Sequence, residues 1–445
     1  MKLIKFTLDN KEVTAAPGVS VLAAALANGF DLPHLCFHPD VETTTPCDLC
    51  LVEVVGQAGF QRACVIKVEA GLIVTSASPA LTAERKRNLE KILAKHLLEC
   101  DDCVWFNDCR LLALAKRFGL LPVKKDKGQD KVFQSGQMVF DQTKCMSCGH
   151  CVSVCPNNCL ALNEADKVSL TQGKDCVNCG QCILHCPVGA LEAVGEFEEL
   201  VGLLADPEII TVAQFAPALR TSFGEEFGLA PGTPVAGQLV AALKAAGFNY
   251  VFDTALGADF TTQEEAGELL ERLVSGNNLP AMSSCCPAWV KLVETEYPEF
   301  VNNLCTSRSP QIMLGGIIKN YWCAQQGIDP AKVRVISIMP CVAKKFEISR
   351  PELMINGQAP VDKVLTAREL ARFFKNKKID FKNITPQKTD EPLGAPSGAG
   401  VIYGASGGVF ESAFRTAYFQ LTGQELLAEA AQEIRGQKSI KEKKF

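Results

Sequence analysis

The chain has 445 residues, of which 47% are hydrophobic and 21% charged, so it can form roughly two to four globular domains with buried cores. Its net charge of −5 argues against a nucleic-acid partner, which needs a basic face. No apolar run reaches the ~18 residues of a membrane span, and the N-terminus lacks the apolar core of a signal peptide. We therefore expect a cytoplasmic protein with no membrane partner.

The first 78 residues contain short strand-like runs at 3–6, 52–54 and 73–74, with a helix-like patch at 21–28. This pattern predicts a small mixed sheet with one helix. Four cysteines in this region can supply the ligands of a 2Fe–2S cluster: Cys36, Cys47, Cys50 and Cys64. A C-x2-C pair also suits a structural zinc ion, which remains the alternative.

Residues 79–120 change to helical spacing and carry a second set of metal-binding side chains. The set consists of His96, Cys100, Cys103 and Cys109. On one continuous helix, His96 and Cys100 would share a face. By themselves these residues suit zinc as well as a 4Fe–4S cluster, and their position directly after the first set favours 4Fe–4S. A charged run at 124–131 then predicts a solvated linker.

An internal repeat in residues 138–197 is the strongest local motif. Cys145-x2-Cys148-x2-Cys151-x3-Cys155-Pro156 recurs as Cys176-x2-Cys179-x2-Cys182-x3-Cys186-Pro187, the pattern of bacterial two-cluster ferredoxins. The fourth cysteine of each run binds the other cluster in that pattern. One cube is therefore expected on Cys145, Cys148, Cys151 and Cys186, and the other on Cys176, Cys179, Cys182 and Cys155. Cys159 is expected to be a buried spare thiol.

Residues 208–445 alternate strand-like runs, at 209–212 and 333–338, with helix-like runs at 239–246 and 266–274. This alternation predicts an α/β catalytic domain, so the whole chain is expected to be an α+β multidomain protein. Cys285 and Cys286 are adjacent and their side chains diverge, so one can bind a metal while the other acts as an acid–base thiol. Cys341 can supply a second ligand. Taken alone, Lys344 and Glu347 predict a solvated helix face.

Two segments of the second half resemble the first and second signatures of FeFe hydrogenases: Ser283-Ser284-Cys285-Cys286-Pro287-Ala288-Trp289 and Met339-Pro340-Cys341-Val342-Ala343-Lys344-Lys345-Phe346-Glu347. Residues 215–217, 224–228, 309–311 and 404–409 are similar to family segments in the same order. The first half resembles the β-grasp 2Fe–2S domain and the histidine-ligated 4Fe–4S domain of multi-cluster hydrogenases. The electron-input subunit of respiratory complex I shares only this half, whereas the hydrogenase resemblance covers almost the whole chain.

The resemblance implies an H-cluster, in which a cysteine bridges a 4Fe–4S cube to a two-iron unit with carbon monoxide, cyanide and an amine-bearing dithiolate. Cys286 and Cys341 would bind the cube, Cys285 would pass protons to the amine, and Lys344 would hydrogen-bond a cyanide. The pocket would be lined by Ala216, Pro217, Pro310, Gln311 and Met339. The electron partner would be a ferredoxin or a flavin/NAD(P)H-binding subunit.

A proton route is implied by the same resemblance. Glu268 would be its outer station and Glu265 its inner one, leading through water to Cys285. Without the resemblance both glutamates would be assigned to the surface. Cys305 stands where the family usually has a serine between them. Because a thiol makes weak hydrogen bonds, we expect a slower relay.

The family's third signature, a C-x3-C motif with glycines, supplies the last two ligands of the cube. No cysteine follows Cys341 here, so we expect an incomplete catalytic domain whose missing part lies on another chain or in a lost C-terminal segment. Two alternatives to a hydrogenase remain: a non-catalytic iron–sulfur subunit of an NADH-oxidising complex, and a hydrogenase-like sensor. No GxGxxG follows a strand, so NAD(P) binding by this chain is not expected, and residues 404–408 predict a backbone turn.

Overall fold

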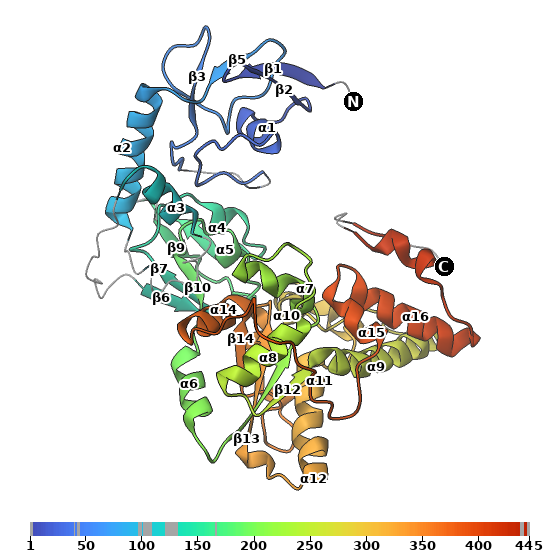
Figure 1. Cartoon of the computed structure of the whole chain (residues 1–445). Helices are drawn as coiled ribbons and strands as arrows, with labels where there is room; N and C mark the ends of the chain where they lie inside the picture. The colour runs from blue at the N-terminus through green and yellow to red at the C-terminus, as the bar shows by residue number, and fades with distance from the viewer. Residues whose placement is uncertain are drawn as a thin grey trace. The chain divides into compact units, whose positions relative to one another are not determined.

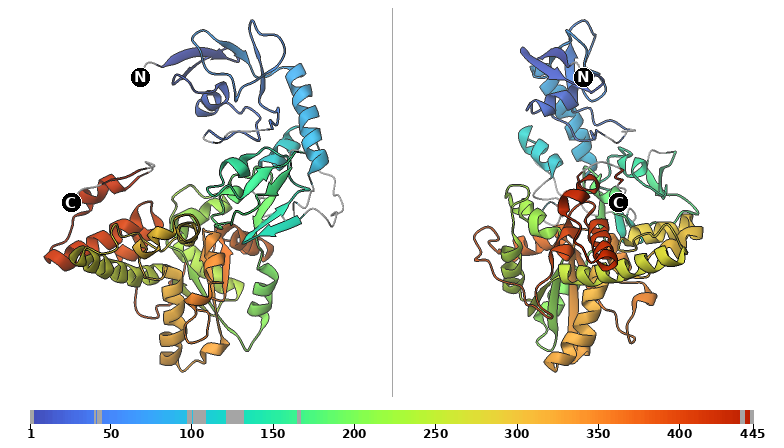
Figure 2. Two further views of the ribbon diagram at one scale, coloured as in Figure 1. Left: turned by 180° about the vertical axis from the view of Figure 1, so that it is seen from behind. Right: turned by 90° about the vertical axis from the view of Figure 1, so that its right-hand side faces the viewer.

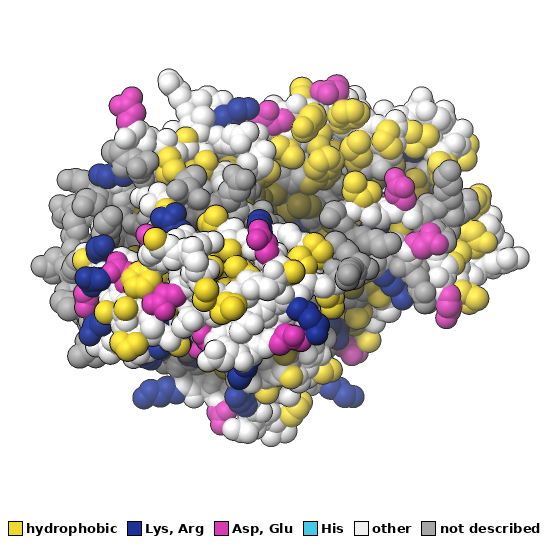
Figure 3. All heavy atoms as spheres, turned by 90° about the horizontal axis from the view of Figure 1, so that it is seen from above, with side chains coloured by type: hydrophobic (Ala, Val, Ile, Leu, Met, Phe, Trp, Pro, Cys, Tyr) yellow, Lys and Arg dark blue, Asp and Glu magenta, His cyan; other side chains and the backbone are white. Residues whose placement is uncertain are grey.

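The computed structural model describes residues 3–39, 41, 45–96, 100, 109–120, 132–164, 167–436 and 440–442. The chain forms two compact units (Figure 1). The first comprises residues 1–175 and 181–193, and the second residues 176–180 and 194–445. Within the described ranges no helix is long and apolar enough to cross a bilayer. Seen from above, basic and acidic side chains are interspersed over the surface (Figure 3).

The first unit begins with a five-stranded mixed sheet in the order β2-β1-β5-β3-β4. Its strands are β1 (Ile4–Leu8), β2 (Lys11–Ala15), β3 (Leu51–Val54), β4 (Gln61–Arg62) and β5 (Ile73–Thr75). Helix α1 (Val21–Ala27) starts at Ser20, whose hydroxyl accepts a hydrogen bond from the Ala23 N–H. The buried side chains of Phe6, Leu8 and Leu22 lie in the core of this region. The predicted small mixed sheet with one helix is confirmed.

Helices α2 (Pro79–Lys95) and α3 (Arg110–Arg117) follow, as the helical spacing predicts. The expectation that His96 continues the first helix is wrong. His96 is the C-cap of α2 with an extended backbone (φ −81°, ψ 127°), and its ring Nδ1 lies 3.2 Å from the Lys144 carbonyl oxygen. Leaving the helix is what allows the ring to contact this distant segment. Residues 97–99, Cys103 and the charged run 124–131 lie outside the described residues.

The internal repeat folds as two short loop–helix–strand segments. Helix α4 (His150–Ser153) carries Cys151, and helix α5 (Gln181–Leu184) carries Cys182. The strands around them are β6 (Val132–Ser135), β7 (Met138–Asp141) and β10 (Leu191–Ala193), which form one antiparallel sheet, and the pair β8 (Leu160–Leu162) and β9 (Val168–Leu170). The two helices contact each other, so the repeat brings its two halves together.

The second unit is built on a parallel sheet in the order β12-β11-β13-β14. Its strands are β11 (Ile210–Phe215), β12 (Tyr250–Asp253), β13 (Val333–Met339) and β14 (Lys363–Thr366). Most residues of β11 and β13 are buried, as expected for parallel strands covered on both faces. Helices surround this sheet in both views of Figure 2. The predicted α/β domain is confirmed.

The α-helices of this unit are α6 (Phe197–Ala205), α7 (Leu219–Ser222), α8 (Ala236–Ala246), α9 (Thr254–Ser275), α10 (Pro287–Glu296), α11 (Pro310–Ile317), α12 (Cys323–Gln326), α13 (Ala343–Glu347), α14 (Ala367–Asn376), α15 (Gly398–Val401) and α16 (Gly408–Thr422). Short 3-10 helices lie at Phe223–Phe227, Pro298–Asn303, Pro330–Lys332, Pro351–Leu353, Ile402–Gly404 and Ala428–Ile434, and a π-helical turn at Ile318–Trp322.

Close backbone packing fixes α9, the longest of these helices, against α11. A Cβ atom on Gly257 of α9 would lie 2.1 Å from the Pro310 carbonyl oxygen, so only glycine allows this approach. Helix α16 lies along α9 as well (Figures 1 and 2). The glycine-rich segment before α16 forms the predicted turn, with Gly407 at φ +86°.

Candidate active site and cluster sites

The four cysteines of the first set gather in one site. A hydrogen bond between Cys36 and Cys47 lowers the pKa of Cys47. A hydrogen bond between Cys50 and Cys64 lowers the pKa of Cys64 in the same way, and the charge of Cys64 also acts on Cys36. Two hydrogen-bonded thiol pairs that interact electrostatically with each other supply the four sulfur donors that a 2Fe–2S cluster requires.

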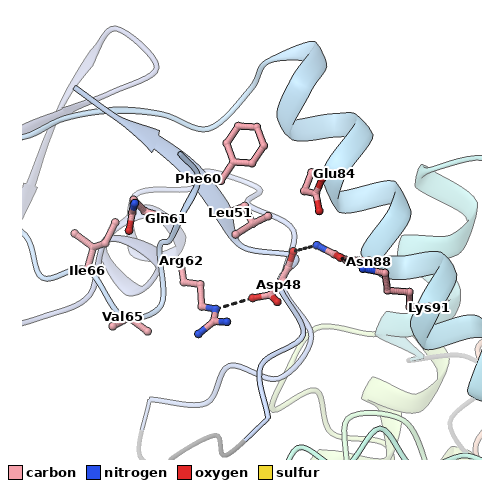
Figure 4. A pocket seen from close by; sticks show the side chains of 10 residues that line it. All are labelled: Asp48, Leu51, Phe60, Gln61, Arg62, Val65, Ile66, Glu84, Asn88 and Lys91. Atoms are coloured by element: carbon pink, nitrogen blue, oxygen red, sulfur yellow. Dashed lines mark hydrogen bonds and ion pairs between the residues drawn. The ribbon is translucent and has the colours of Figure 1, made fainter. Parts of the chain in front are cut away.

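An open cavity of about 580 Å³ lies beside this site, between β3, β4 and α2 (Figure 4). Arg62 forms an ion pair of 2.6 Å with Asp48, and the Asn88 side chain donates to the Asp48 carbonyl at 3.1 Å. These contacts tie the cysteine-bearing loops to helix α2. The lining residues are Asp48, Leu51, Phe60, Gln61, Arg62, Val65, Ile66, Glu84, Asn88 and Lys91.

A second cavity is lined by four cysteines of the repeat: Cys145, Cys148, Cys151 and Cys186. Cys186 comes from the second run, so it lies where the two-cluster pattern predicts. Phe140, Val168 and Leu191 make the walls apolar, and burial raises the pKa of Cys148 to about 12. Four thiols around an apolar cavity suit a 4Fe–4S cube.

The remaining ligand sets stay predictions. Cys100 and Cys109 are half-buried, and Cys109 caps α3 through the Leu112 N–H at 3.4 Å. Their partner Cys103 lies outside the described residues. The other set consists of the half-buried Cys155, Cys176, Cys179 and Cys182. Cys159, the spare thiol, is buried as predicted and donates to the Asp175 carbonyl at 2.8 Å.

The signature residues of the second half meet at the carboxyl ends of β11 and β13. Ala216 and Pro217 follow β11, and Met339 ends β13 two residues before Cys341. Pro310 and Gln311 start α11, and the Gln214 side chain of β11 donates to the Gln311 carbonyl at 3.0 Å. Ligands of open α/β sheets bind beyond these strand ends, so this is the expected place for a site.

Lys344 is held at this site by two short contacts. Its ammonium donates to the Cys285 carbonyl at 2.8 Å and to Glu347 Oε2 at 3.0 Å. The same carboxylate oxygen accepts hydrogen bonds from Ser309 Oγ at 2.8 Å and Gln311 Nε2 at 2.6 Å. Burial alone would lower the pKa of Lys344, but Glu347 and Cys285 outweigh it and raise that pKa. The ammonium therefore stays charged inside the protein.

The expectation that Lys344 and Glu347 face solvent is wrong. Their side chains are only 12% and 7% exposed. A buried lysine and carboxylate are tolerated when they pair with each other and their remaining hydrogen-bonding capacity is used. Ser309 and Gln311 complete that requirement here.

Cys285 and Cys341 both interact with this lysine. Cys285 is half-buried and interacts electrostatically with Lys344 and Cys286. Cys341 interacts electrostatically with the same two residues. Cys286 is exposed, as expected if adjacent side chains diverge. Gln311 Oε1 is buried and accepts no hydrogen bond from the described residues. The thiols of Cys285 and Cys341 beside the fixed Lys344 ammonium fit the H-cluster that the resemblance implies.

The inner glutamate is buried. Glu265 is 4% exposed, and its Oε1 accepts hydrogen bonds from Ser283 Oγ at 2.8 Å and Ser307 Oγ at 3.3 Å. Burial raises the pKa of Glu265, so this carboxyl keeps its proton to higher pH than a free glutamate. Its contribution to stability is therefore full below the ordinary glutamate pKa of 4.5 and is lost as pH rises through the raised pKa of the folded state. The surface assignment from pattern alone is wrong for Glu265.

The outer glutamate, Glu268, and Cys305 lie near this position. Glu268 Oε2 accepts from the Thr306 backbone N–H at 2.8 Å and from Thr306 Oγ1 at 3.1 Å, and its other oxygen pairs with Arg272 at 2.5 Å. Burial raises the pKa of Cys305 to about 12, with smaller contributions from Glu265 and Glu268. Cys305 is therefore a neutral thiol near both carboxylates.

Three family profiles match the chain. Residues 209–445 match the iron-only hydrogenase large subunit, C-terminal domain. The chain belongs to this family. A 2Fe–2S iron–sulfur cluster binding domain matches residues 1–79, and a 4Fe–4S dicluster domain matches residues 144–190. The predicted family, the hydrogenase domain and the ferredoxin-like domains are confirmed, while residues 79–120 remain a predicted domain.

Similar proteins agree with this assignment. The NADP-reducing hydrogenase subunit HndD of Solidesulfovibrio fructosivorans is 36% identical, over 100% of this chain and 80% of that protein. Iron hydrogenase 1 of Clostridium pasteurianum is 35% identical, over 95% of this chain and 76% of that protein. The cytosolic iron–sulfur assembly component 3 of Mus musculus is 31% identical, over only 48% of this chain and 47% of that protein. This chain is thus an iron hydrogenase, an oxidoreductase in which iron–sulfur clusters relay electrons.

Sequence reasoning missed four polar groups of this hydrogenase. Ser283, Thr306 and Ser307 contact the two glutamates, yet serine and threonine in loops carry no periodic signal. The fourth is His150, which is 3% exposed and hydrogen-bonds the backbone at His185 and Cys36. Burial lowers the pKa of His150, so its ring is neutral. Nothing in the repeat distinguishes this position from its neighbours.

Proposed function

We propose that this hydrogenase binds its H-cluster through Cys286 and Cys341, with Lys344 as hydrogen-bond donor to a cyanide ligand. The bound group supplies the iron centre at which H2 and protons are interconverted. The position of the Lys344 ammonium, fixed by contacts of 2.8 and 3.0 Å and interacting with Cys285 and Cys341, carries this proposal. The pocket is lined by Ala216, Pro217, Pro310, Gln311 and Met339.

Cys285 exchanges protons with the bound group in this proposal, and Glu268 and Glu265 connect it to solvent. Burial raises the pKa of both Cys285 and Glu265, so each keeps a proton at neutral pH more readily than in water. Proton transfer by positioned groups of this kind contributes about 10²- to 10⁴-fold to a rate.

Electrons pass through four clusters in this proposal. The first is a 2Fe–2S cluster on Cys36, Cys47, Cys50 and Cys64, and the second is a histidine-ligated 4Fe–4S cluster on His96, Cys100, Cys103 and Cys109. Two 4Fe–4S cubes follow on the cysteines of the repeat. The partner is a ferredoxin or a flavin/NAD(P)H-binding subunit. The similarity to a subunit of an NADP-reducing hydrogenase supports the second of these partners.

Isotope exchange separates this proposal from a chain that only carries electrons. Anaerobically matured protein is incubated with H2 in D2O without an electron partner, and HD is followed by mass spectrometry. HD formation is expected for the wild type and not for Cys341→Ser with the same N-terminal clusters. Wild-type protein that forms no HD despite a full set of clusters would favour the electron-transfer alternative.

Cluster assignment in the repeat is tested by replacing Cys186 with alanine. Because Cys186 lines the cavity with three cysteines of the first run, its loss is expected to remove one cube, about four irons per chain. Iron analysis and electron paramagnetic resonance measure this loss. Cys159→Ala is the matched control, since Cys159 is buried in the same repeat without lining that cavity. Equal iron loss in both variants would contradict the assignment.

Replacing Cys305 with serine is expected to raise the rate of HD formation about 2- to 10-fold, because a hydroxyl transfers protons through stronger hydrogen bonds than a thiol. The solvent isotope effect on the rate should fall at the same time. Cys305→Ala controls for the loss of the thiol itself. An unchanged rate in the serine variant would show that Cys305 does not limit the relay.

A further inference from the structure

A single hydroxyl bridges the inner carboxyl and the catalytic thiol. Ser283 Oγ lies 2.8 Å from Glu265 Oε1 and 3.4 Å from Cys285 Sγ. Both distances are hydrogen-bonding distances, the longer one to sulfur. A serine hydroxyl has one hydrogen to donate and two lone pairs to accept, so it can contact a donor and an acceptor together. The resemblance implies a water molecule for this step.

We propose that Ser283 is a proton-relay residue, which moves protons between Glu265 and Cys285 through its own hydroxyl. This rests on the proposed role of Cys285. Toward the active site, the Glu265 O–H bond breaks and a new O–H bond forms at Ser283. The original Ser283 O–H bond breaks, and an S–H bond forms on the Cys285 thiolate. No electron changes hands, and rotation of the hydroxyl restores the starting arrangement.

The neighbours of Ser283 hold it in this place. The Met282 N–H donates to the Asn303 carbonyl at 2.8 Å, and the Cys305 N–H donates to the Met282 carbonyl at 2.7 Å. On the other side, Ser284 Oγ donates to the Ser307 carbonyl at 2.9 Å. The loop is thus attached before and after Ser283 to the segment that contacts both glutamates. Such attachment gives the fixed geometry that proton transfer requires.

A purely structural role for Ser283 would be redundant. Glu265 keeps hydrogen bonds from Ser307 Oγ and from the Ser284 backbone when the Ser283 hydroxyl is removed. Ser307 contacts Glu265 as Ser283 does, at 3.3 Å against 2.8 Å. The contact to Cys285 Sγ is what distinguishes Ser283, so Ser307 is the matched control.

The test compares Ser283→Ala, Ser283→Thr and Ser307→Ala in the matured full chain. Ser283→Ala is expected to slow HD formation by about 10-fold or more, and threonine to restore it, because threonine keeps the hydroxyl. Ser307→Ala, which removes a contact to Glu265 but none to Cys285, is expected to slow HD formation less than Ser283→Ala does and to leave the S–H band of Cys285 unmoved. Ser283→Ala is also expected to shift the S–H stretching band of Cys285 in infrared spectra recorded without turnover. That band is assigned to Cys285 because it is lost in Cys285→Ala.

Two results would overturn the relay role: wild-type exchange in Ser283→Ala, or slow exchange in both Ser283 variants with an unmoved S–H band. These results are distinct from failure of the proposed function, in which the wild type itself forms no HD. Thermal unfolding of each variant separates a folding defect from a slow relay. If Ser283→Ala does not fold, the threonine variant decides, since it must match the wild type in both rate and S–H band.

Discussion

Replacing Cys285 with alanine is expected to lower H2 turnover by about 10²- to 10⁴-fold without changing the iron content of the protein. The reason is that in the proposed mechanism Cys285 acts on protons and does not bind iron. Its thiol contacts Ser283 at 3.4 Å, and burial raises its pKa so that it retains a proton. H2 evolution with a reduced dye and iron analysis of the same sample measure the two quantities.

Cys323→Ala is the control for this experiment. Cys323 is fully buried in the hydrophobic core of the same unit, near Trp322, so its loss affects packing. We expect it to lower stability by about 1–2 kcal/mol and to leave turnover within a factor of two. Iron loss in Cys285→Ala would identify Cys285 as a ligand, and unchanged turnover would remove it from the proton route.

The adjacent lysines of α13 are expected to respond differently to the same substitution. Lys344→Gln should lower H2 turnover by about 10²- to 10³-fold, the usual effect of losing one preorganised donor, and should also lower stability because the buried Glu347 loses its cation. Lys345→Gln should lower stability by about 3–5 kcal/mol for the same reason, without a comparable loss of turnover in the folded protein. Lys345 is 3% exposed and contacts Glu369 at 3.1 Å, Glu196 at 3.4 Å and the Val194 carbonyl at 2.9 Å.

Thermal unfolding and amide hydrogen exchange of β14 measure the stability effect, and HD formation at low temperature measures activity. The two lysines serve as controls for each other, since they share a helix and a charge. A variant of Lys345 that is stable but inactive, or a variant of Lys344 that only unfolds more readily, would contradict this division. Either result would move the functional contact from one lysine to the other.

The parts of the fold that depend on local pattern could be predicted from the sequence. The alternation of strands and helices predicted the α/β domain, and the spacing of Cys145, Cys148 and Cys151 placed three cysteines of one cavity. Their fourth partner, Cys186, followed from the pairing of two complete repeats. These features depend on residues a few positions apart in the sequence, or on the similarity between the two halves of an internal repeat.

The polar contacts of the active site could not be predicted in the same way. Glu265 is buried because Ser283 and Ser307 reach it from 18 and 42 residues away. Glu347 is buried because Ser309 and Gln311 lie 38 and 36 residues before it. Burial of an ionisable side chain depends on such tertiary partners, so the pattern alone assigned these residues to solvent. The end of α2 at Lys95 likewise depends on where the His96 ring binds.

Infrared spectroscopy of anaerobically matured protein is the most direct test of an H-cluster held beside Lys344 by Cys286 and Cys341. Cyanide and carbonyl stretching bands are expected in the wild type. The cyanide bands should shift in Lys344→Gln, and all of these bands should vanish in Cys341→Ala. The absence of cyanide and carbonyl bands from wild-type protein with intact iron–sulfur absorbance would contradict the assignment.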